Sequence, residues 1–420
     1  MATVTITQIT DSLQQQLNIS AQGGRDKWST ATDNQKQPDI EYHPDRAKWK
    51  ARTARRLEAD PSLPDTALPE GFPQKLDSPL VWEGKDWKDE KEWVYQLKAA
   101  EIKEIGDAVK HFHGLDKPLG FISPSTFPLP TLGPVLSSIA RELHTGRGFS
   151  VLRGIPVTSY SRADNILIYA GVSSYVGGLR GLQDKNGGVL AHIKDLSRTH
   201  PAESIGAPAY TTDRQVFHTD AGDIISLFAL ETAAEGGVSK ISSSWRVYND
   251  LAQNRHDLID TLSKPWPFDG FGGDPPYTTR PLLFHVDGKI VIQYARRLFT
   301  GFQGLPRSRD IPSITEAQAE ALDTLHFLAE KYALHLDFQK GDIQYINNLS
   351  IFHARDGFRD DADHTRHLLR LWLRNEELAW SLPEALEPNW KRLYYSVTPE
   401  EQRFPLEAEI RSASKGGVKY

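Results

Sequence analysis

The chain has 420 residues, of which 39% are hydrophobic and 25% charged, an ordinary globular composition that allows a sizeable core. Its net charge of -6 argues against a nucleic-acid partner, because nucleic-acid-binding domains usually carry a basic excess. The chain has no cysteine, which excludes disulfides, zinc fingers, iron–sulfur clusters and thiol nucleophiles. Any metal must therefore be held by histidine, carboxylate or water.

The N-terminal region is polar. Residues 1–80 are rich in Pro, Asp and Lys and predict an extended arm, with one short basic helix around Pro44–Leu57 whose charged face we expect to be solvated. The first residues lack the charged start and apolar stretch of a signal peptide, and no apolar run is long enough to cross a bilayer. We therefore expect a soluble cytoplasmic protein with no membrane partner.

The next part of the chain predicts three helices and one strand. Apolar residues recur at steps of three and four over Asp89–His113 and again over Leu132–His144, which is typical of amphipathic helices. Between glycines, the stretch GRGFSVLRGIP predicts a strand. Ser161 is a suitable N-cap for a third helix that runs through Tyr169.

After Gly177 the pattern changes from helix to strand. Short segments rich in β-branched and aromatic residues follow one another, and Asp287-Gly288 is a typical hairpin turn. The segments are VFHTD, ISLFALE, GVSKISS, KIVIQY, LHLDF, DIQYIN, IFHAR and RHLLRLWLR. Two helices interrupt them, one over Arg246–Leu262 and one that begins at the capping box of Thr315 and Gln318.

This order of elements predicts a mainly β protein with peripheral helices, built on a double-stranded β-helix or jelly-roll core. We expect one such domain over residues 81–400, followed by a C-terminal tail at 401–420. Gly270-Phe271-Gly272-Gly273 follows no strand and opens no helix in this scheme, so we interpret it as a loop and not as a phosphate-binding turn.

Four His-x-Asp tripeptides are candidates for metal binding, since two residues two apart on a strand point to the same side. The four tripeptides begin at His43, His218, His285 and His335. His43 stands in the polar arm, and His285 precedes the Asp-Gly turn. His218-Thr-Asp220 follows a strand and enters a flexible Ala-Gly-Asp stretch, which makes it the best candidate.

His353 is a candidate second imidazole, because it stands near the end of the apolar segment NNLSIFHARDGF. Two imidazoles and one carboxylate leave three positions free on an octahedral Fe(II), which suits O₂ chemistry with a bidentate 2-oxo acid. Arg366 and Arg370 then share one face of an otherwise apolar strand, roughly 13 Å apart at ~3.3 Å per residue. A buried guanidinium requires an anion, and the spacing suits two different anions.

These stretches resemble the TauD/TfdA family of iron(II)- and 2-oxoglutarate-dependent dioxygenases, in its fungal branch. FHTDAGD, ETAAEGGVSKISS, GDIQYINNLSIFHARDGF and RHLLRLWLR carry the resemblance, which covers most of residues 65–380. It implies that His218, Asp220 and His353 hold Fe(II). It further implies that Arg366, with Ser239, binds the distal carboxylate of 2-oxoglutarate, and that Arg370 binds the substrate.

The resemblance implies an oxidoreductase that uses O₂ to oxidise an unactivated C–H bond, giving succinate and CO₂. We expect a small anionic substrate, either an amino acid or an organic acid of secondary metabolism, with Gln183 and His192 as further pocket residues. The roles of Arg366 and Arg370 can be exchanged in this scheme. The oligomeric state stays open and includes a homodimer.

Other interpretations also stay open at this point. The same cofactors can end in desaturation or in ring closure, such as aziridine formation from an amino acid. A cupin-like metal hydrolase or a non-catalytic jelly-roll binding module would use the same fold without needing Arg366.

Overall fold

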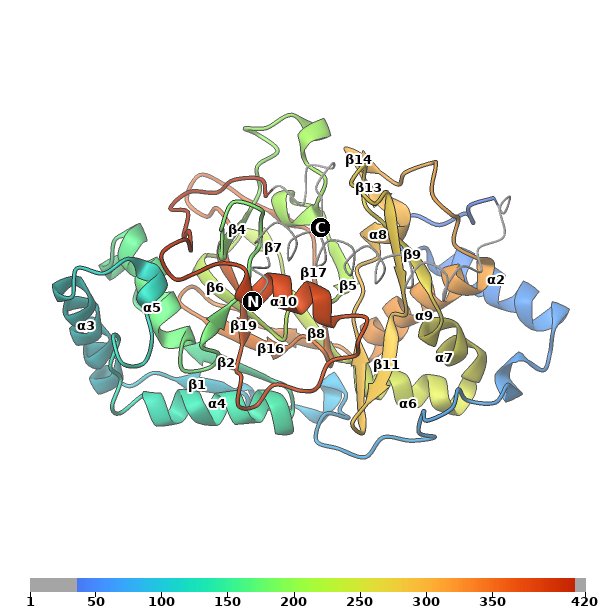
Figure 1. Ribbon diagram of the computed structural model, residues 1–420, viewed down its shortest axis with the longest axis horizontal. Coiled ribbons are helices and arrows are strands. Elements are labelled where there is room, and N and C mark those ends of the chain that lie inside the picture. The colour runs from blue at the N-terminus through green and yellow to red at the C-terminus, as the bar shows by residue number, and fades with distance from the viewer. Residues whose placement is uncertain (1–35, 412–420) are drawn as a thin grey trace, which may run out of the picture.

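The computed structural model describes residues 36–411, so the first part of the expected arm and the end of the expected tail lie outside the described residues. Two β-sheets face each other between two groups of helices (Figure 1). The larger sheet has the order β1-β2-β16-β6-β19-β3, with β4 also paired to β19, and the smaller has the order β15-β8-β17-β5. This arrangement confirms the predicted jelly-roll core with peripheral helices.

The strands of the larger sheet are β1 Val94–Gln96, β2 Phe149–Arg153, β3 Leu179–Arg180, β4 Leu190–Lys194, β6 Ile224–Glu231, β16 Ile343–Asn347 and β19 His367–Arg374. Those of the smaller sheet are β5 Gln215–His218, β8 Ser239–Ser243, β15 Leu334–Leu336 and β17 Ile351–Arg355. The Asp-Gly turn joins β11 Leu283–Val286 to β12 Lys289–Ile292, and Asp287 and Gly288 both have positive φ, as this turn requires.

Helices cover both outer faces of the jelly roll. On one side lie α3 Ala99–Gly114, α4 Gly133–Thr145 and α5 Arg162–Ser173, whose apolar faces share a core with outward residues of the larger sheet such as Phe228 and Leu369 (Figure 1). On the other side lie α2 Arg46–Ala59, α6 Ser244–Asn254, α7 His256–Ser263 and α9 Glu316–Tyr332. Within the described ranges, no helix is long and apolar enough to cross a membrane.

The caps predicted from the sequence are present. The Ser161 hydroxyl accepts a hydrogen bond from the backbone N–H of Asp164, and Thr315 and Gln318 form the expected reciprocal capping box of α9. The predicted helices over Leu132–His144 and after Ser161 are confirmed as α4 and α5.

Two predicted helix boundaries are wrong. Val94–Gln96 is strand β1, which pairs in parallel with β2, so the helix begins only at Ala99. The β-branched and aromatic residues there gain more from the sheet edge than from a helical turn. The predicted helix over Arg246–Leu262 breaks at Arg255, whose φ of −152° is not helical and whose guanidinium binds Asp257 at 2.8 Å.

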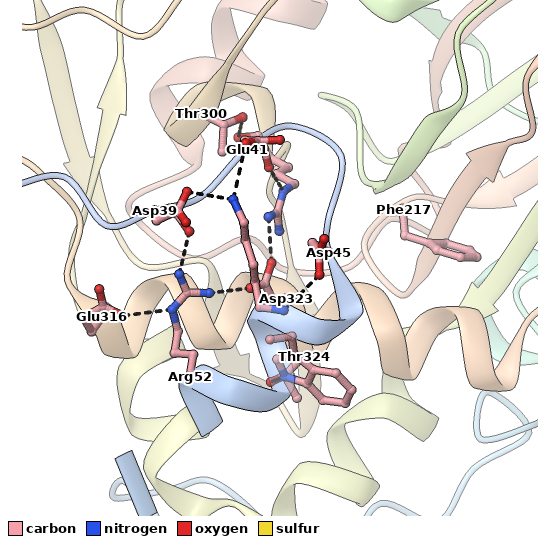
Figure 2. A network of polar contacts seen from close by, with 12 residues as sticks. Asp39, Glu41, Asp45, Arg52, Phe217, Thr300, Glu316, Asp323 and Thr324 are labelled. Atoms are coloured by element: carbon pink, nitrogen blue, oxygen red, sulfur yellow. Dashed lines mark hydrogen bonds and ion pairs between the residues drawn. The ribbon is translucent and has the colours of Figure 1, made fainter. Parts of the chain in front are cut away.

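The basic face of α2 is solvated only in part: Arg46, Lys48, Lys50 and Arg55 are exposed as predicted, but Arg52 is buried. Arg52 is 3% exposed and its guanidinium binds Asp323 at 2.7 Å, Glu316 at 2.8 Å and the carbonyl of Asp39 at 2.7 Å (Figure 2). The acidic partners come from α9, which the amphipathic pattern of α2 alone does not reveal. Helix α2 is therefore fixed to α9 beside the smaller sheet.

Candidate metal centre and its pocket

His218, Asp220 and His353 come together at the edge of the smaller sheet. His218 ends β5, and His353 stands directly opposite it on the antiparallel strand β17. One possible ligand atom from each of the three residues lies within 4.8 Å of the others, and the two imidazole rings are 4.1 Å apart. Across residues 36–411, this is the single group of three such side chains, so His43, His285 and His335 belong to no comparable cluster.

Neighbouring amides and carbonyls orient these side chains. The backbone N–H of Asp220 donates to Oδ1 of Asn348 at 2.8 Å, and the Asn348 amide donates back to the Asp220 carbonyl at 2.6 Å. Nδ1 of His218 lies 2.9 Å from the carbonyl of Val216. If Nδ1 carries the proton, Nε2 presents a lone pair, which is the usual arrangement of a ligating histidine. In the structure that lone pair faces the side-chain amide nitrogen of Gln215 at 3.0 Å, a contact that a bound metal would replace.

The electrostatics of the cluster suit a divalent cation. Burial lowers the pKa of His218 and lowers that of His353 well below its ordinary value. Burial raises the pKa of Asp220, but the positive charge of the neighbouring Arg370 is the largest of the opposing interactions, which together lower the pKa overall. Two neutral imidazoles and one ionised carboxylate are thus available, and these are the protonation states that metal binding needs.

A pocket extends from His353 along the space between the two sheets. Its polar lining includes Ser239, Arg355, Arg366 and Arg370, and its apolar lining includes Leu368. The structure therefore brings Ser239, Arg366 and Arg370 to the same pocket as one of the candidate metal ligands. Gly237 gives Arg366 its room, because a Cβ there would lie 3.3 Å from the Arg366 side chain.

Arg366 is a buried cation without an anionic partner. The residue is 5% exposed, and the buried Nη1 of its guanidinium has no hydrogen-bond partner among the described residues. The acid that acts on it is Asp360, which accepts a hydrogen bond from its backbone N–H at 2.9 Å and forms no ion pair with its guanidinium. The nearest aromatic contact is the Phe358 ring, 5.4 Å from the guanidinium carbon. Burial, together with the charge of Arg355, lowers the pKa of Arg366 to about 9. A site that keeps such a charge buried is suited to an incoming anion.

Arg370 is largely committed to protein partners. Its Nε donates to Oε1 of Gln183 at 2.9 Å and its Nη1 to Oδ2 of Asp220 at 2.5 Å, whereas its buried Nη2 has no partner among the described residues. Gln183 also donates to the carbonyls of Arg370 and Val189, so every polar group of its side chain is used. Gln183 thus orients Arg370 and does not itself offer a free polar group to the pocket.

His192 lies away from the pocket, in contrast to our expectation. It stands opposite Leu369 in the β4–β19 pair, whereas Arg370 stands opposite Ala191, so the two side chains point to different faces of the sheet. Nδ1 of His192 lies 2.7 Å from Nε2 of His367, and Nε2 lies 2.8 Å from the carbonyl of Pro405. Since a strand alternates its faces, the observed register places His192 on the outward face of the sheet.

Three residues near the site were not anticipated from the sequence. Asn348 holds the backbone of Asp220, Trp372 donates its indole N–H to the Asp220 carboxylate at 3.2 Å, and Arg355 lines the pocket beside Arg366. The paired amides of NNLS give a signal for Asn348, because they directly precede the strand of His353. Trp372 and Arg355 have no comparable signal.

The comparison with known proteins decides the family. Residues 115–372 match the family described as taurine catabolism dioxygenase TauD, TfdA family. The chain belongs to the TauD/TfdA family. It is accordingly a non-haem Fe(II)- and 2-oxoglutarate-dependent dioxygenase that uses O₂, as predicted, and the interpretations as a hydrolase or a non-catalytic module fall away.

Individual relatives agree with this assignment. The TauD/TfdA chain is 38% identical over 335 residues to the taurine hydroxylase-like protein SAT17 of Stachybotrys chartarum, covering 78% of this chain and 87% of that protein. It is 25% identical over 306 residues to FR-33289 synthase of Streptomyces rubellomurinus, covering 70% and 89% of the two proteins. The fold is similar to that of an asparagine oxygenase in complex with Fe(II), 3-hydroxyasparagine and succinate, with a TM-score of 0.51, 16% identity, and coverage of 67% and 93%.

Proposed function

We propose that His218, Asp220 and His353 hold the Fe(II) of this dioxygenase, and that it oxidises a C–H bond of a small anionic substrate. When bound, the iron with 2-oxoglutarate supplies the oxidising power, and 2-oxoglutarate leaves as succinate and CO₂. The observation that carries the proposal is the buried, unpaired Arg366 in the same pocket as His353. A metal cluster without such a cation would equally suit a hydrolase.

Arg366 and Ser239 are the proposed partners of the distal carboxylate of 2-oxoglutarate. The guanidinium offers parallel N–H donors that fit a carboxylate, and the buried Ser239 hydroxyl lines the same pocket. Leu368, Leu227 and Ile193 line it as well and exclude water from the carbon chain. The low-polarity surroundings strengthen the ion pair, since a buried pair is little screened.

The proposed substrate is an amino acid or a small organic acid with a negatively charged group near Arg370. The free Nη2 of Arg370 supports this, because one buried N–H still lacks an acceptor. Two similar proteins support the same substrate class: a taurine hydroxylase-like protein, and an asparagine oxygenase with bound 3-hydroxyasparagine. We expect hydroxylation of the substrate. Desaturation or ring closure is the alternative, and the mass of the product distinguishes the two.

Absorption spectroscopy without oxygen tests the cofactor assignment. Addition of Fe(II) and then 2-oxoglutarate to the purified protein should give a weak visible charge-transfer band that needs both. His353→Ala should abolish the band, whereas His335→Ala should keep it, because the exposed His335 belongs to another His-x-Asp tripeptide. If the wild-type protein gives no band, the proposed metal and cosubstrate site is wrong.

Succinate release tests the substrate class. With the band established, amino acids, taurine and short organic acids are screened for substances that accelerate the conversion of 2-oxoglutarate to succinate. A product 16 mass units heavier than its substrate indicates hydroxylation, and one two units lighter indicates desaturation or ring closure. Acceleration by neutral compounds alone would contradict an anionic substrate.

A further inference from the structure

A second cavity, which we call the outer cavity, lies on the outward face of the larger sheet. Three of its lining residues stand side by side on neighbouring strands, since His367 of β19 pairs with Lys194 of β4 and with Glu231 of β6. Their chain neighbours Ile193 and Leu368 line the pocket beside the candidate metal centre instead, because successive residues of a strand face opposite sides of the sheet. The volume of the outer cavity is about 370 Å³, which is in the range of small-molecule sites.

The hydrogen bonds around His367 determine which of its ring nitrogens carries the proton. Nε2 of His192 lies 2.8 Å from the carbonyl of Pro405, and because a carbonyl only accepts, this nitrogen is the donor. Burial lowers the pKa of both imidazoles, so both rings are neutral at pH 7 and Nδ1 of His192 is an acceptor. Nε2 of His367, which lies 2.7 Å from that Nδ1, is therefore a donor. This leaves Nδ1 of His367 as an acceptor that has no partner among the described residues.

Asn165 of α5 supplies the outer cavity with another acceptor. Its Nδ2 donates to the carbonyls of Val157, Tyr160 and Ser161 at 3.0, 3.2 and 2.9 Å. These three bonds fix the orientation of the amide, because a flipped amide would place its oxygen against carbonyl oxygens. Asn165 is 3% exposed and lines the cavity, and its Oδ1 is buried without a partner among the described residues. Since a buried acceptor without a donor is unfavourable, this position favours a ligand that carries N–H or O–H groups.

The outer cavity also carries charges of both signs. Lys194 is half-buried and pairs with no acid that the structure describes. The exposed Arg162 lines the same cavity, and its ion pair with Glu407 is 3.6 Å long and exposed. Glu231 supplies a negative charge, which it shares with Lys340 at 2.5 Å. The cavity therefore offers cations to an anionic group, and a carboxylate with two neutral acceptors to a group with several N–H donors.

We propose that the outer cavity is a second binding site, separate from the pocket beside the candidate metal centre, for a small zwitterion such as an α-amino acid. An ammonium group has three N–H donors, which match Glu231, Nδ1 of His367 and Oδ1 of Asn165. The carboxylate of the ligand would lie beside Lys194 and Arg162. A simple anion would leave the acceptors without donors, and a simple amine would leave Lys194 unpaired. The proposal is independent of the proposed function, because the outer cavity involves neither the metal ligands nor Arg366.

Calorimetric titration of the twenty amino acids tests this site. Each amino acid is added without oxygen to enzyme loaded with Fe(II) and 2-oxoglutarate, and to the metal-free protein. At least one should bind with the same Kd in both, whereas binding of a substrate beside the iron should need the loaded enzyme. For the tightest of these ligands, the matching amide without the carboxylate and the matching acid without the amino group should each bind about 10-fold more weakly.

Two variants and one control assign this binding to the outer cavity. Lys194→Met should weaken the Kd by about 10-fold, the low end for a charged hydrogen bond because Lys194 is half-buried, and the amino acid and its amide should then bind alike. Glu231→Gln should also weaken the Kd and should reduce the preference over the acid without the amino group. Lys391→Met removes an exposed lysine from α10 Glu387–Tyr395 and should change the Kd less than about twofold.

Two results would overturn the outer cavity as a binding site. One is that no amino acid binds with the same Kd in the presence and absence of the metal. The other is that such binding is found but its Kd is unchanged in both Lys194→Met and Glu231→Gln. Absence of the visible band in the wild type would instead overturn the metal site, and it would leave the result of this titration valid.

Discussion

Replacement of Arg366 by methionine should make the protein without ligands more stable and at the same time less active. At pH 7 the guanidinium is charged in both the folded and the unfolded chain, but burial lowers its folded pKa from 12.5 to about 9. At about 1.4 kcal/mol per pKa unit, this difference between the folded and unfolded pKa corresponds to a destabilisation of the folded state of at most about 5 kcal/mol. Because the surroundings of the charge relax, we expect a destabilisation of roughly 2–5 kcal/mol. Methionine has a similar length and needs no partner.

The same change should damage the binding of 2-oxoglutarate. Loss of a bidentate, charge-assisted pair with the distal carboxylate removes about 2–3 kcal/mol, which is a rise of roughly 30- to 150-fold in the KM for 2-oxoglutarate. The KM for the main substrate should change little, because Arg370 and not Arg366 lies beside Asp220. If the KM for the main substrate rises and that for 2-oxoglutarate does not, the roles of the two arginines are exchanged.

Thermal unfolding of the metal-free protein tests the predicted gain in stability, and steady-state kinetics test the predicted rise in the KM for 2-oxoglutarate. We expect the Tm of Arg366→Met to rise by about 2–6 °C, since a chain of this size gains about one degree per kcal/mol. Arg359→Met is the matched control: that arginine is 69% exposed in its side chain and pairs with an exposed glutamate, so both Tm and KM should stay near wild type. A lower Tm in Arg366→Met with an unchanged KM for 2-oxoglutarate would refute the reasoning.

Three further outcomes are expected. Arg52→Ala should lower the free energy of unfolding by about 1–3 kcal/mol, because the buried Asp323 then keeps only Arg296 as a charged partner. Arg46→Ala breaks an exposed pair and should cost less than about 1 kcal/mol, and urea denaturation measures both changes. Asn348→Ala should weaken Fe(II) binding by about 10- to 100-fold, since it frees the backbone of Asp220, and a metal titration checks this. Burial lowers the pKa of His326 from 6.5 to about 3, so the buried histidine stays neutral in the folded state while it becomes protonated in the unfolded chain below pH 6.5. The free energy of unfolding of the wild type should therefore fall as the pH drops from 6.5 towards 3. In His326→Leu it should depend less steeply on pH between 6.5 and 4 than in the wild type.

The sequence was most informative where one local pattern decides one local structure. Alternation of side chains predicted the strands around His218 and His353, and the capping residues predicted where α5 and α9 begin. The features that were missed depend on partners distant in the chain. The burial of Arg52 depends on carboxylates of α9, and β1 forms only because β2 offers it a free edge. No local pattern carries that information.

In the candidate site, too, the features set by local sequence could be predicted and those set by distant partners could not. The types and spacing of the candidate metal ligands follow from the chemistry of a two-histidine, one-carboxylate site, and the resemblance to a family assigned roles to the arginines. The orientation of His192 depends on the register between β4 and β19, which the sequence of one strand does not fix.

Arg370 and Arg374 of β19, with Arg366 directly before it, show how the role of the arginines changes from structural to ligand-binding along one stretch of chain. Arg374 is paired with the buried Asp223 at 2.5 Å, and its pKa is raised although burial opposes this. Arg370 lies nearer the pocket, binds Asp220 and keeps Nη2 without a partner among the described residues. Arg366, one residue before the strand, forms no ion pair with any acid that the structure describes. Because a buried guanidinium without an anion destabilises the fold, the declining number of protein acids marks the positions where the protein leaves the anion to its ligands. The order along the strand therefore supports 2-oxoglutarate at Arg366 and the substrate at Arg370, and not the reverse.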